Sequence, residues 1–169
     1  MMDLSNEEKN GMTKEILLSI FDYSDGVLIW KEPDDIKGSK TIYKSKDGYK
    51  RVRINGIAYL HYRLVFLFHK GYIPKYINHR NRIRDDDHIG NLRECTSSQN
   101  AMNRKISSIN TSGIKGVTFI GGDGKCWRAC LMLHKKYVFN KTFHTSKEAI
   151  EALNKARAEH HGEFANNGN

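Results

Sequence analysis

The segment from residue 76 to residue 100, YINHRNRIRDDDHIGNLRECTSSQN, concentrates side chains that bind metal ions or transfer protons. A histidine side chain is a natural general base at neutral pH, and His79 lies within this segment. The amide oxygens of Asn78 and Asn100 are hard ligands of the kind that Mg²⁺ accepts while it keeps several waters. Hydrolysis of a phosphodiester needs an activated water, a base and positive charge near the phosphate. The side chains of this segment fit that chemistry.

The surrounding sequence predicts elements that would bring these side chains together. Residues 75–77 are predicted as a short strand just ahead of His79, and residues 96–103 as a helix that presents Asn100. Asn91 lies between the two and is expected to fix the intervening loop through hydrogen bonds to the backbone. The end of a strand and a helix could then converge on one ion.

The elements before this segment follow from local patterns. Residues 13–21 are predicted as a helix with Thr13 as N-cap, and residues 27–30 as a strand after a turn. Residues 31–47 are polar and are predicted to be irregular. Asn55-Gly56 is a strong signal for a hairpin between two strands.

A helix is predicted over residues 63–70, because Gly71 and then Pro74 end an apolar stretch. Its apolar run, residues 64–68, is far shorter than the ~20 residues that cross a bilayer. The N-terminus lacks a signal-peptide pattern, so we expect no membrane association and an intracellular protein. The three cysteines form no C-x-x-C pair, which argues against a disulfide framework or a structural zinc site.

The motifs above, in this order, resemble the core of the HNH homing-endonuclease family. INHRNRIRDDDHIGNLRECTSSQN is similar to the family form I-D-H-x-(D/N)-G, a variable loop, N-x-I-x-N-L-R and T-x-x-x-N. YLHYRLVFLFHKGYIPK resembles the family segment before it, so that the resemblance covers residues 21–104. It implies an α+β fold with a ββα-metal (His-Me finger) core. It also implies that His79 is the general base, that Asn91 fixes the loop, and that Asn78 and Asn100 hold Mg²⁺ or Mn²⁺.

The segment departs from the family pattern at several positions. Asn78 stands where Asp is usual, which removes a negative charge beside the ion and predicts weaker metal binding. Tyr62 stands where the family has His, with His61 one residue early. Because one step along a strand reverses the direction of a side chain, His61 would face the other way. Arg82 replaces the Gly after the base, and Asp87 replaces a loop Asn.

Other side chains of the same types lack such a context. His61, His69 and His88 are expected to be structural. The run Asp85-Asp86-Asp87 is expected to be a solvated loop rather than a metal cluster, because consecutive side chains diverge.

The remainder of the chain has a different pattern. Residues 105–112 are polar and small and are predicted to be a linker between a nuclease core, residues 1–104, and a second domain, residues 113–169. In the second domain GVTFI, CWRACLML and KYVFNKTF predict three strands. A helix should follow from Thr145, which forms a capping box with Glu148.

This second domain resembles the Apetala-type, ethylene-response-factor-like DNA-binding domain. The resemblance is carried by Gly116-Val117, Trp127-Arg128-Ala129, Thr142-Phe143 and the helix that contains Glu148. It implies a small three-stranded antiparallel sheet plus helix, with the sheet in the major groove. Strand alternation puts Arg128 with the half-buried Cys126 and Cys130 on one face, and Trp127, Ala129 and Leu131 on the other.

The charge distribution points to a polyanionic partner. Residues 1–36 hold three Lys/Arg and nine Asp/Glu, a balance of −6, whereas residues 37–169 hold 25 and 10, a balance of +15. Such a basic stretch attracts nucleic acid. The cations expected to contact DNA are Arg63, Arg93, Lys115, Lys125, Arg128, Lys135, Lys136 and Lys141.

These observations predict a metal-dependent homing endonuclease of phage type, a monomer that nicks or cuts double-stranded DNA in the infected cell. Asn78 leaves an alternative open, which is a DNA-binding or regulatory protein that derives from an HNH nuclease and no longer cuts. An RNA-binding module is less favoured, because no KH-type G-x-x-G motif is evident.

Overall fold

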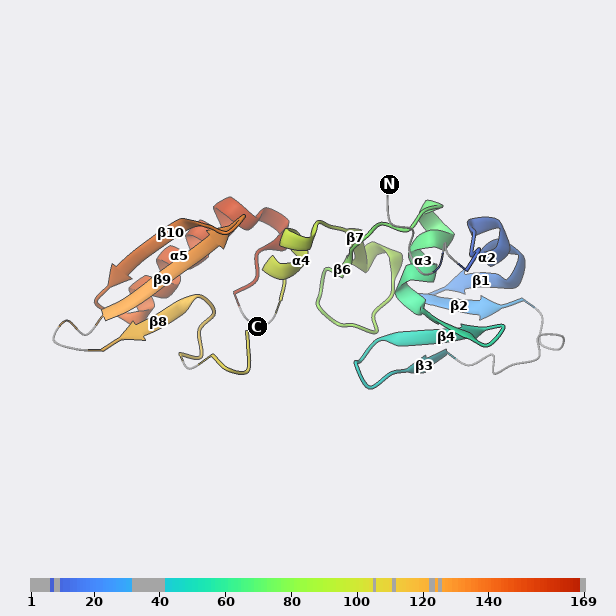
Figure 1. Cartoon of the computed structure of the whole chain (residues 1–169), viewed down its shortest axis with the longest axis horizontal. Helices are drawn as coiled ribbons and strands as arrows, with labels where there is room; N and C mark the ends of the chain where they lie inside the picture. The colour runs from blue at the N-terminus through green and yellow to red at the C-terminus, as the bar shows by residue number, and fades with distance from the viewer. Residues whose placement is uncertain are drawn as a thin grey trace. The chain divides into compact units, whose positions relative to one another are not determined.

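The structure is a computed structural model that describes residues 7, 10–31, 42–104, 106–110, 112–121, 124 and 126–167. It is a mixed α/β protein with small antiparallel sheets. The chain divides into two compact units, residues 1–95 and residues 96–169, and most of their helices and strands are labelled in Figure 1. Within the described residues, no helix has both the length and the apolar character that a membrane span requires.

In its described residues, the first unit contains three small sheets and two helices of seven or more residues. Its elements are α2 (Lys14–Ile20), β1 (Phe21–Ser24), β2 (Val27–Trp30), β3 (Ile42–Lys44), β4 (Lys50–Ile54), β5 (Ile57–Leu60), α3 (His61–Lys70), β6 (Ile77–His79), η1 (Ile89–Asn91) and β7 (Leu92–Glu94). β1 pairs with β2, β3 with β4 and β4 with β5, and β6 pairs with β7.

Several elements of this unit confirm the sequence prediction. The Thr13 hydroxyl accepts a hydrogen bond from the backbone N–H of Ile16 at 3.3 Å, which caps α2 as expected. Asn55 and Gly56 both have positive φ (48° and 81°), the conformation of a type I′ turn, and they join β4 to β5. Gly71, with φ 79°, ends α3.

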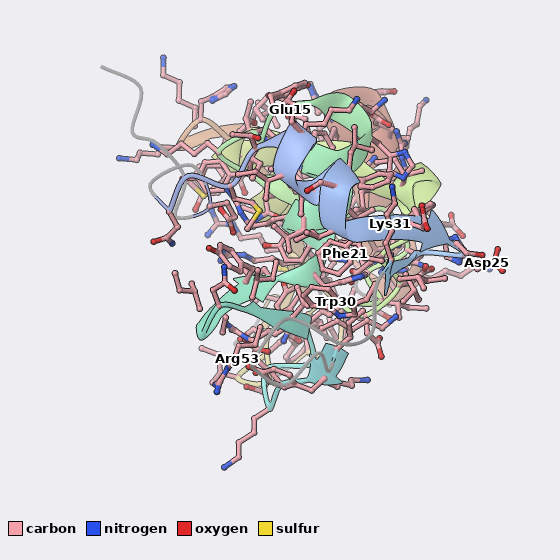
Figure 2. The ribbon with its side chains drawn as sticks, turned by 90° about the vertical axis from the view of Figure 1, so that its right-hand side faces the viewer. Glu15, Phe21, Asp25, Trp30, Lys31 and Arg53 are labelled. Carbon is pink, nitrogen blue, oxygen red and sulfur yellow. The ribbon has the colours of Figure 1, made fainter. Side chains whose placement is uncertain are left out.

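Other predictions for this unit are wrong. The first helix ends at Ile20, one residue earlier than predicted, and Phe21 is its C-cap. Phe21 also begins β1 and pairs with Trp30, and both are labelled in Figure 2. Their ring centroids lie 4.3 Å apart. Residues 42–44, expected to be irregular, form β3, which gains its hydrogen bonds from β4; residues 32–41 lie outside the described part. The predicted strand over residues 75–77 is instead β6, which begins at residue 77 because its partner β7 lies opposite residues 77–79.

The core of the first unit lies between the two helices and the adjacent sheets. Leu17 from α2, Phe21 from β1, Leu28 from β2 and Leu64 from α3 are at most 1 % exposed. Full burial of such a side chain stabilises the fold by about 1.5–3 kcal/mol. This packing holds the first turn of α3, where His61 and Tyr62 lie, against the β1–β2 hairpin.

The second unit is a three-stranded sheet with one long helix on one face. Its elements are α4 (Ser97–Met102), β8 (Val117–Ile120), β9 (Cys126–Leu133), β10 (Lys136–Phe143), α5 (Ser146–His161) and η2 (Gly162–Phe164). The strands are antiparallel in the order β10-β9-β8, and α5 runs along one face of them (Figure 1). The predicted three strands and helix are therefore present, and both hydrogen bonds of the predicted capping box at Thr145 and Glu148 are formed.

The sheet and the helix enclose a compact apolar core. Ala149 and Leu153 of α5 pack with Val117 of β8 and Ala129 of β9, and all four are at most 1 % exposed. Gly116, with φ 74°, precedes β8 where a Cβ atom would meet the carbonyl oxygen of Cys130 at 2.9 Å. The close approach of these strands therefore requires glycine at position 116.

Helix α4 belongs to the second unit through its C-terminal end. The last carbonyls of a helix lack partners within the helix. The Lys115 ammonium donates to the carbonyls of Met102 (2.9 Å) and Arg104 (2.7 Å), and the Asn166 amide donates to those of Asn103 (2.9 Å) and Arg104 (2.8 Å). These contacts tie α4 to residues that come later in the chain.

Candidate functional site

His79 is the last residue of a buried strand. In the β6–β7 hairpin Asn78 lies opposite Arg93 and His79 lies opposite Leu92. The hairpin buries Asn78 (7 % exposed), His79 (6 %) and Arg93 (7 %). Buried polar groups need hydrogen-bond partners, so the contacts of these side chains define the site.

A buried carboxylate joins His79 to a second histidine. Asp87 Oδ1 lies 2.9 Å from His79 Nε2, and Asp87 Oδ2 lies 2.6 Å from His61 Nδ1. The backbone N–H of Leu28 donates to His61 Nε2 at 3.2 Å. The side chains of His61 and Asp87 are both 0 % exposed. We call His79, Asp87 and His61 the buried triad.

The donors in the buried triad fix the tautomer of each ring. Because His61 Nε2 accepts from Leu28, the proton of a neutral His61 is on Nδ1, which donates to Asp87. An ionised carboxylate only accepts, so His79 donates from Nε2. In the neutral ring of His79 the lone pair is then on Nδ1, which is the atom able to take up a proton.

The position of Asp87 corrects the expectation of a solvated aspartate run. Asp87 is 1 % exposed, whereas Asp85 forms an ion pair with the exposed Lys44 at 2.6 Å. Burial would raise the pKa of the Asp87 carboxyl. The hydrogen bonds from His61 and His79 outweigh burial and hold that pKa below its usual value. Asp87 is therefore ionised at neutral pH and its charge stays inside the fold.

The position of His61 differs from the expectation as well. His61 and Tyr62 begin helix α3 and are not on a strand, so a one-residue offset turns the side chain by one helical step rather than reversing it. Both side chains reach the site: His61 contacts Asp87, and the Tyr62 ring lies 5.1 Å from the ring of His79. His69 and His88 are outside the buried triad.

Aromatic rings cover His79 on another side. The Tyr49 ring centroid lies 5.9 Å from that of His79 and 5.5 Å from that of Tyr62. Burial raises the pKa of Tyr62 to about 12, so its hydroxyl stays protonated at neutral pH. The guanidinium of Arg84 lies 5.3 Å from the Tyr49 ring centroid, which brings a cation near the site.

Asn91 ties down the loop between the two strands. Its side-chain oxygen accepts from the Asn81 backbone N–H (3.0 Å), and its amide donates to the Asp86 carbonyl (2.7 Å). These are hydrogen bonds to backbone of the kind that the sequence predicts for Asn91. They hold the loop that carries Asp87, although a part for Asn91 in catalysis stays a prediction.

The loop also holds a residue in an unusual backbone conformation. Arg82 has φ 64°, in the left-handed region that glycine adopts most easily. Position 82 is where the HNH pattern has Gly, and the backbone conformation explains that preference. An arginine is accommodated here at a cost in backbone energy.

The candidate metal ligands form a donor set without charge. Asn78 Oδ1 accepts from the Nε of Arg93 at 3.1 Å. An amide oxygen has a second lone pair that could bind an ion, but the guanidinium would oppose a cation there. Among the described residues, no three His, Cys, Asp or Glu side chains form a group that could hold a metal ion. Asn100 is on α4 in the second unit.

Both of the DNA-binding cations predicted in the first unit, Arg63 and Arg93, have partners. Arg93 donates to Asn78, as described above. Arg63 Nε donates to Glu7 Oε2 at 2.9 Å, and their side chains are 12 % and 5 % exposed. Glu7 thus provides a counter-charge for Arg63. Exposed cations that the sequence reasoning left out are Arg53 on β4 (Figure 2), and Arg80 and Arg84 in the loop.

The predicted DNA-binding residues of the second unit lie on different surfaces. Arg128 projects from the sheet face opposite α5, since its neighbour Ala129 is 0 % exposed beneath the helix. Its Nε donates to Asn140 Oδ1 at 2.9 Å, and its guanidinium lies 5.5 Å from the Tyr137 ring. Lys141 pairs with Ala129 and thus points to the other face.

The remaining lysines are spread along the unit. Lys135 is in the turn between β9 and β10, and Lys136 begins β10. Lys115 caps α4, and Lys125 lies outside the described residues. Cys126 and Cys130 are half-buried on β9, as predicted.

Comparison with known proteins supports one part of this description. Residues 58–102 match the family model described as HNH endonuclease. The match runs from β5 through α3 and the β6–β7 hairpin to the end of α4, and it includes the buried triad. No match to the chain was found among the curated proteins or the solved structures. Residues 58–102 are therefore similar to an HNH endonuclease domain.

Proposed function

We propose that the protein is a metal-dependent HNH endonuclease that hydrolyses DNA phosphodiester bonds. The observation that carries the proposal is the orientation of His79. Its Nε2 donates to the buried Asp87, within the segment that matches the HNH endonuclease model. The sequence resemblance favours a homing enzyme of phage type that acts as a monomer inside the infected cell.

The chain's own residues supply the base. His79 Nδ1 takes a proton from water, and the resulting hydroxide forms a bond to phosphorus. The bond between phosphorus and the leaving oxygen breaks, and that oxygen takes a proton from solvent. The His79 ring becomes cationic in this step, and the Asp87 carboxylate at 2.9 Å stabilises the charge.

HNH nucleases generally use a divalent metal ion, which would stabilise charge on the phosphate and the leaving oxygen. From the HNH resemblance we propose that Asn78 and Asn100 are its protein ligands. Neither ligand carries charge, so we expect the ion to bind weakly until phosphate oxygens of DNA complete its coordination.

We propose that the second unit positions the DNA. Its sheet face opposite α5 carries Arg128 together with Met132 and Tyr137, which are 50 % and 54 % exposed. A cation with an adjacent aromatic ring suits a nucleic-acid surface. The Apetala-type resemblance favours the same face, with Arg128 and Lys125 facing DNA and Lys135 and Lys136 near phosphates. Lys141, also predicted near phosphates, lies on the α5 side of the sheet.

A plasmid assay tests the nuclease proposal. Supercoiled DNA is incubated with the full-length protein and Mg²⁺ or Mn²⁺, beside a His79→Ala variant. We expect nicked or linear product from the wild type. The variant should cut at least about 10²-fold more slowly and should shift DNA in a gel as the wild type does. Equal cutting by both proteins would refute the role of His79.

A specific contact favours a second candidate function, a DNA-binding protein that has lost cleavage. The buried Arg93 occupies one lone pair of Asn78, where the family has a negatively charged Asp. A gel shift without cutting in either metal would support this candidate. If an Asn78→Asp variant then gained cleavage, the missing charge would be the cause, because an aspartate would offset Arg93 and attract the ion.

A further inference from the structure

We propose that Asp87 and His61 act together as positioning residues for His79, an arrangement that replaces two residues of the usual HNH pattern. This inference rests on the proposed nuclease function. Asp87 stands where the pattern has Asn, and His61 stands one residue ahead of the usual His. Each appears as an isolated departure in the sequence, but the two side chains meet at 2.6 Å.

The geometry explains why the two departures occur together. An aspartate at position 87 puts a charge into a site where its side chain is 0 % exposed, and a lone buried charge is costly. His61 offsets that cost, because its Nδ1–H donates to Asp87 while its Nε2 accepts from Leu28. Neither an asparagine nor a leucine at position 61 would both donate to Asp87 and accept from the Leu28 N–H in the geometry of an imidazole ring.

The negative charge of the Asp87 carboxylate acts on the ring of His79. The carboxylate accepts only, so it selects the tautomer with the proton on Nε2 and the lone pair on Nδ1. It also stabilises the ring when Nδ1 becomes protonated. A carboxylate that is buried and hydrogen-bonded to a basic histidine has the same two effects in Ser-His-Asp triads. A neutral amide at position 87 would provide neither effect fully.

His61 has its effect through Asp87 and does not contact His79 in any described hydrogen bond. Its backbone position is fixed independently by helix α3 and by the β1–β2 hairpin, which provides the Leu28 N–H. Substitution of Asp87 should therefore reduce the cleavage rate more than substitution of His61 does. The losses in cleavage rate from the two substitutions should not combine in the double variant, because His61 has no role once the carboxylate is removed.

The test compares Asp87→Asn, His61→Gln and the double variant in full-length protein. The measurement is the single-turnover rate of DNA cleavage at saturating protein and metal. We expect Asp87→Asn to reduce the rate by about 10²- to 10⁴-fold and His61→Gln by about 10-fold. The double variant should be no slower than Asp87→Asn. DNA affinity in EDTA should stay within a factor of about two.

Asp85→Asn is the matched control. It makes the same chemical change two residues away, at a partly exposed carboxylate paired with Lys44, and it should leave the cleavage rate unchanged. An Asp87→Asn rate within about threefold of the wild type would overturn the proposal, as would a double variant whose two losses simply multiply.

A spectroscopic readout keeps the proposal testable if the variants do not fold or if the wild type does not cut. Long-range proton–nitrogen NMR spectra of the imidazole rings identify the tautomer of each histidine. We expect the Nε2–H tautomer for His79 and the Nδ1–H tautomer for His61 in the wild type. A different His79 tautomer would overturn the positioning role. The expected tautomers together with absence of cleavage would instead refute the proposed nuclease function.

Discussion

The two units of the chain bury polar side chains for different purposes. In the first unit His61, His79 and Asp87 form a closed hydrogen-bonded group that includes a titratable ring. In the second unit the buried polar side chains Asn166 and Arg157 donate to backbone carbonyls and hold segments together. The first arrangement keeps a reactive group in one orientation, whereas the second stabilises a scaffold that leaves a sheet face open.

This difference suggests a division between chemistry and docking. Changes in the core of the first unit should leave DNA binding by the second unit intact, and changes on the open sheet face should alter affinity without altering the chemical step. Four experiments test the comparison, beginning with the largest expected effect.

Truncation of Leu153 to Ala should destabilise the second unit alone. Leu153 is 1 % exposed between α5 and the sheet, and such truncations cost about 2–5 kcal/mol. Calorimetry and hydrogen exchange of the full-length protein should show earlier unfolding of the sheet and α5, with the first unit unchanged. Glu151→Ala, on the exposed side of α5, is the control and should have little effect. Equal destabilisation of both units would contradict the division.

Replacement of Arg128 by Ala should weaken DNA binding about 5- to 10-fold and reduce the salt dependence of binding by about one ion. The cleavage rate at saturating DNA should stay the same. Lys147→Ala makes the same change of charge on α5, which covers the other face of the sheet, and it should have a smaller effect on affinity. Titrations at several salt concentrations measure both variants. An equal loss of DNA affinity in the two variants would show that the sheet face is not the docking surface.

Arg82→Gly should stabilise the first unit by about 0.5–1 kcal/mol, because glycine adopts the left-handed conformation without steric cost. Arg80, two residues earlier, does not have a positive φ, so Arg80→Gly should destabilise the unit by a similar amount. Thermal unfolding measures both. A loss of stability in Arg82→Gly would mean that the side chain contributes more to the fold than the backbone conformation costs.

Acid should weaken the first unit through Asp87. The pKa of Asp87 is lowered in the folded state from 3.8, so its contribution to stability is present above about pH 4. That contribution is lost as the pH falls through the folded pKa. Thermal unfolding between pH 6 and pH 2 should show this loss in the wild type and a weaker dependence in Asp87→Asn. Identical profiles would show that the charge of Asp87 does not stabilise the fold.

Local signals in the sequence predicted much of the fold. Asn55-Gly56 determined one hairpin, and the capping box at Thr145 determined the start of α5. Both signals act within a few residues, where backbone conformation is set by the residues themselves. β3 could not be predicted in this way, because its three residues are a strand only through hydrogen bonds to β4.

The candidate site was predicted only in part, for a related reason. His79 and Asn91 follow from a linear motif. His61 and Asp87 are 26 positions apart, and each alone matches a common structural or solvated residue. The available signal was that both depart from the same family pattern, and only the three-dimensional contact connects them.

The partners of α4 have a consequence for the order in which the molecule is completed during synthesis. Asn166 reaches back 63 positions to the carbonyl of Asn103. A nascent chain that ends near residue 110 therefore lacks both Lys115 and Asn166, and the carbonyls at the end of α4 face water. The helix that carries Asn100 gains its full support only after residue 166 has been synthesised, so a shorter nascent chain should hold Asn100 less firmly than a chain that includes Asn166.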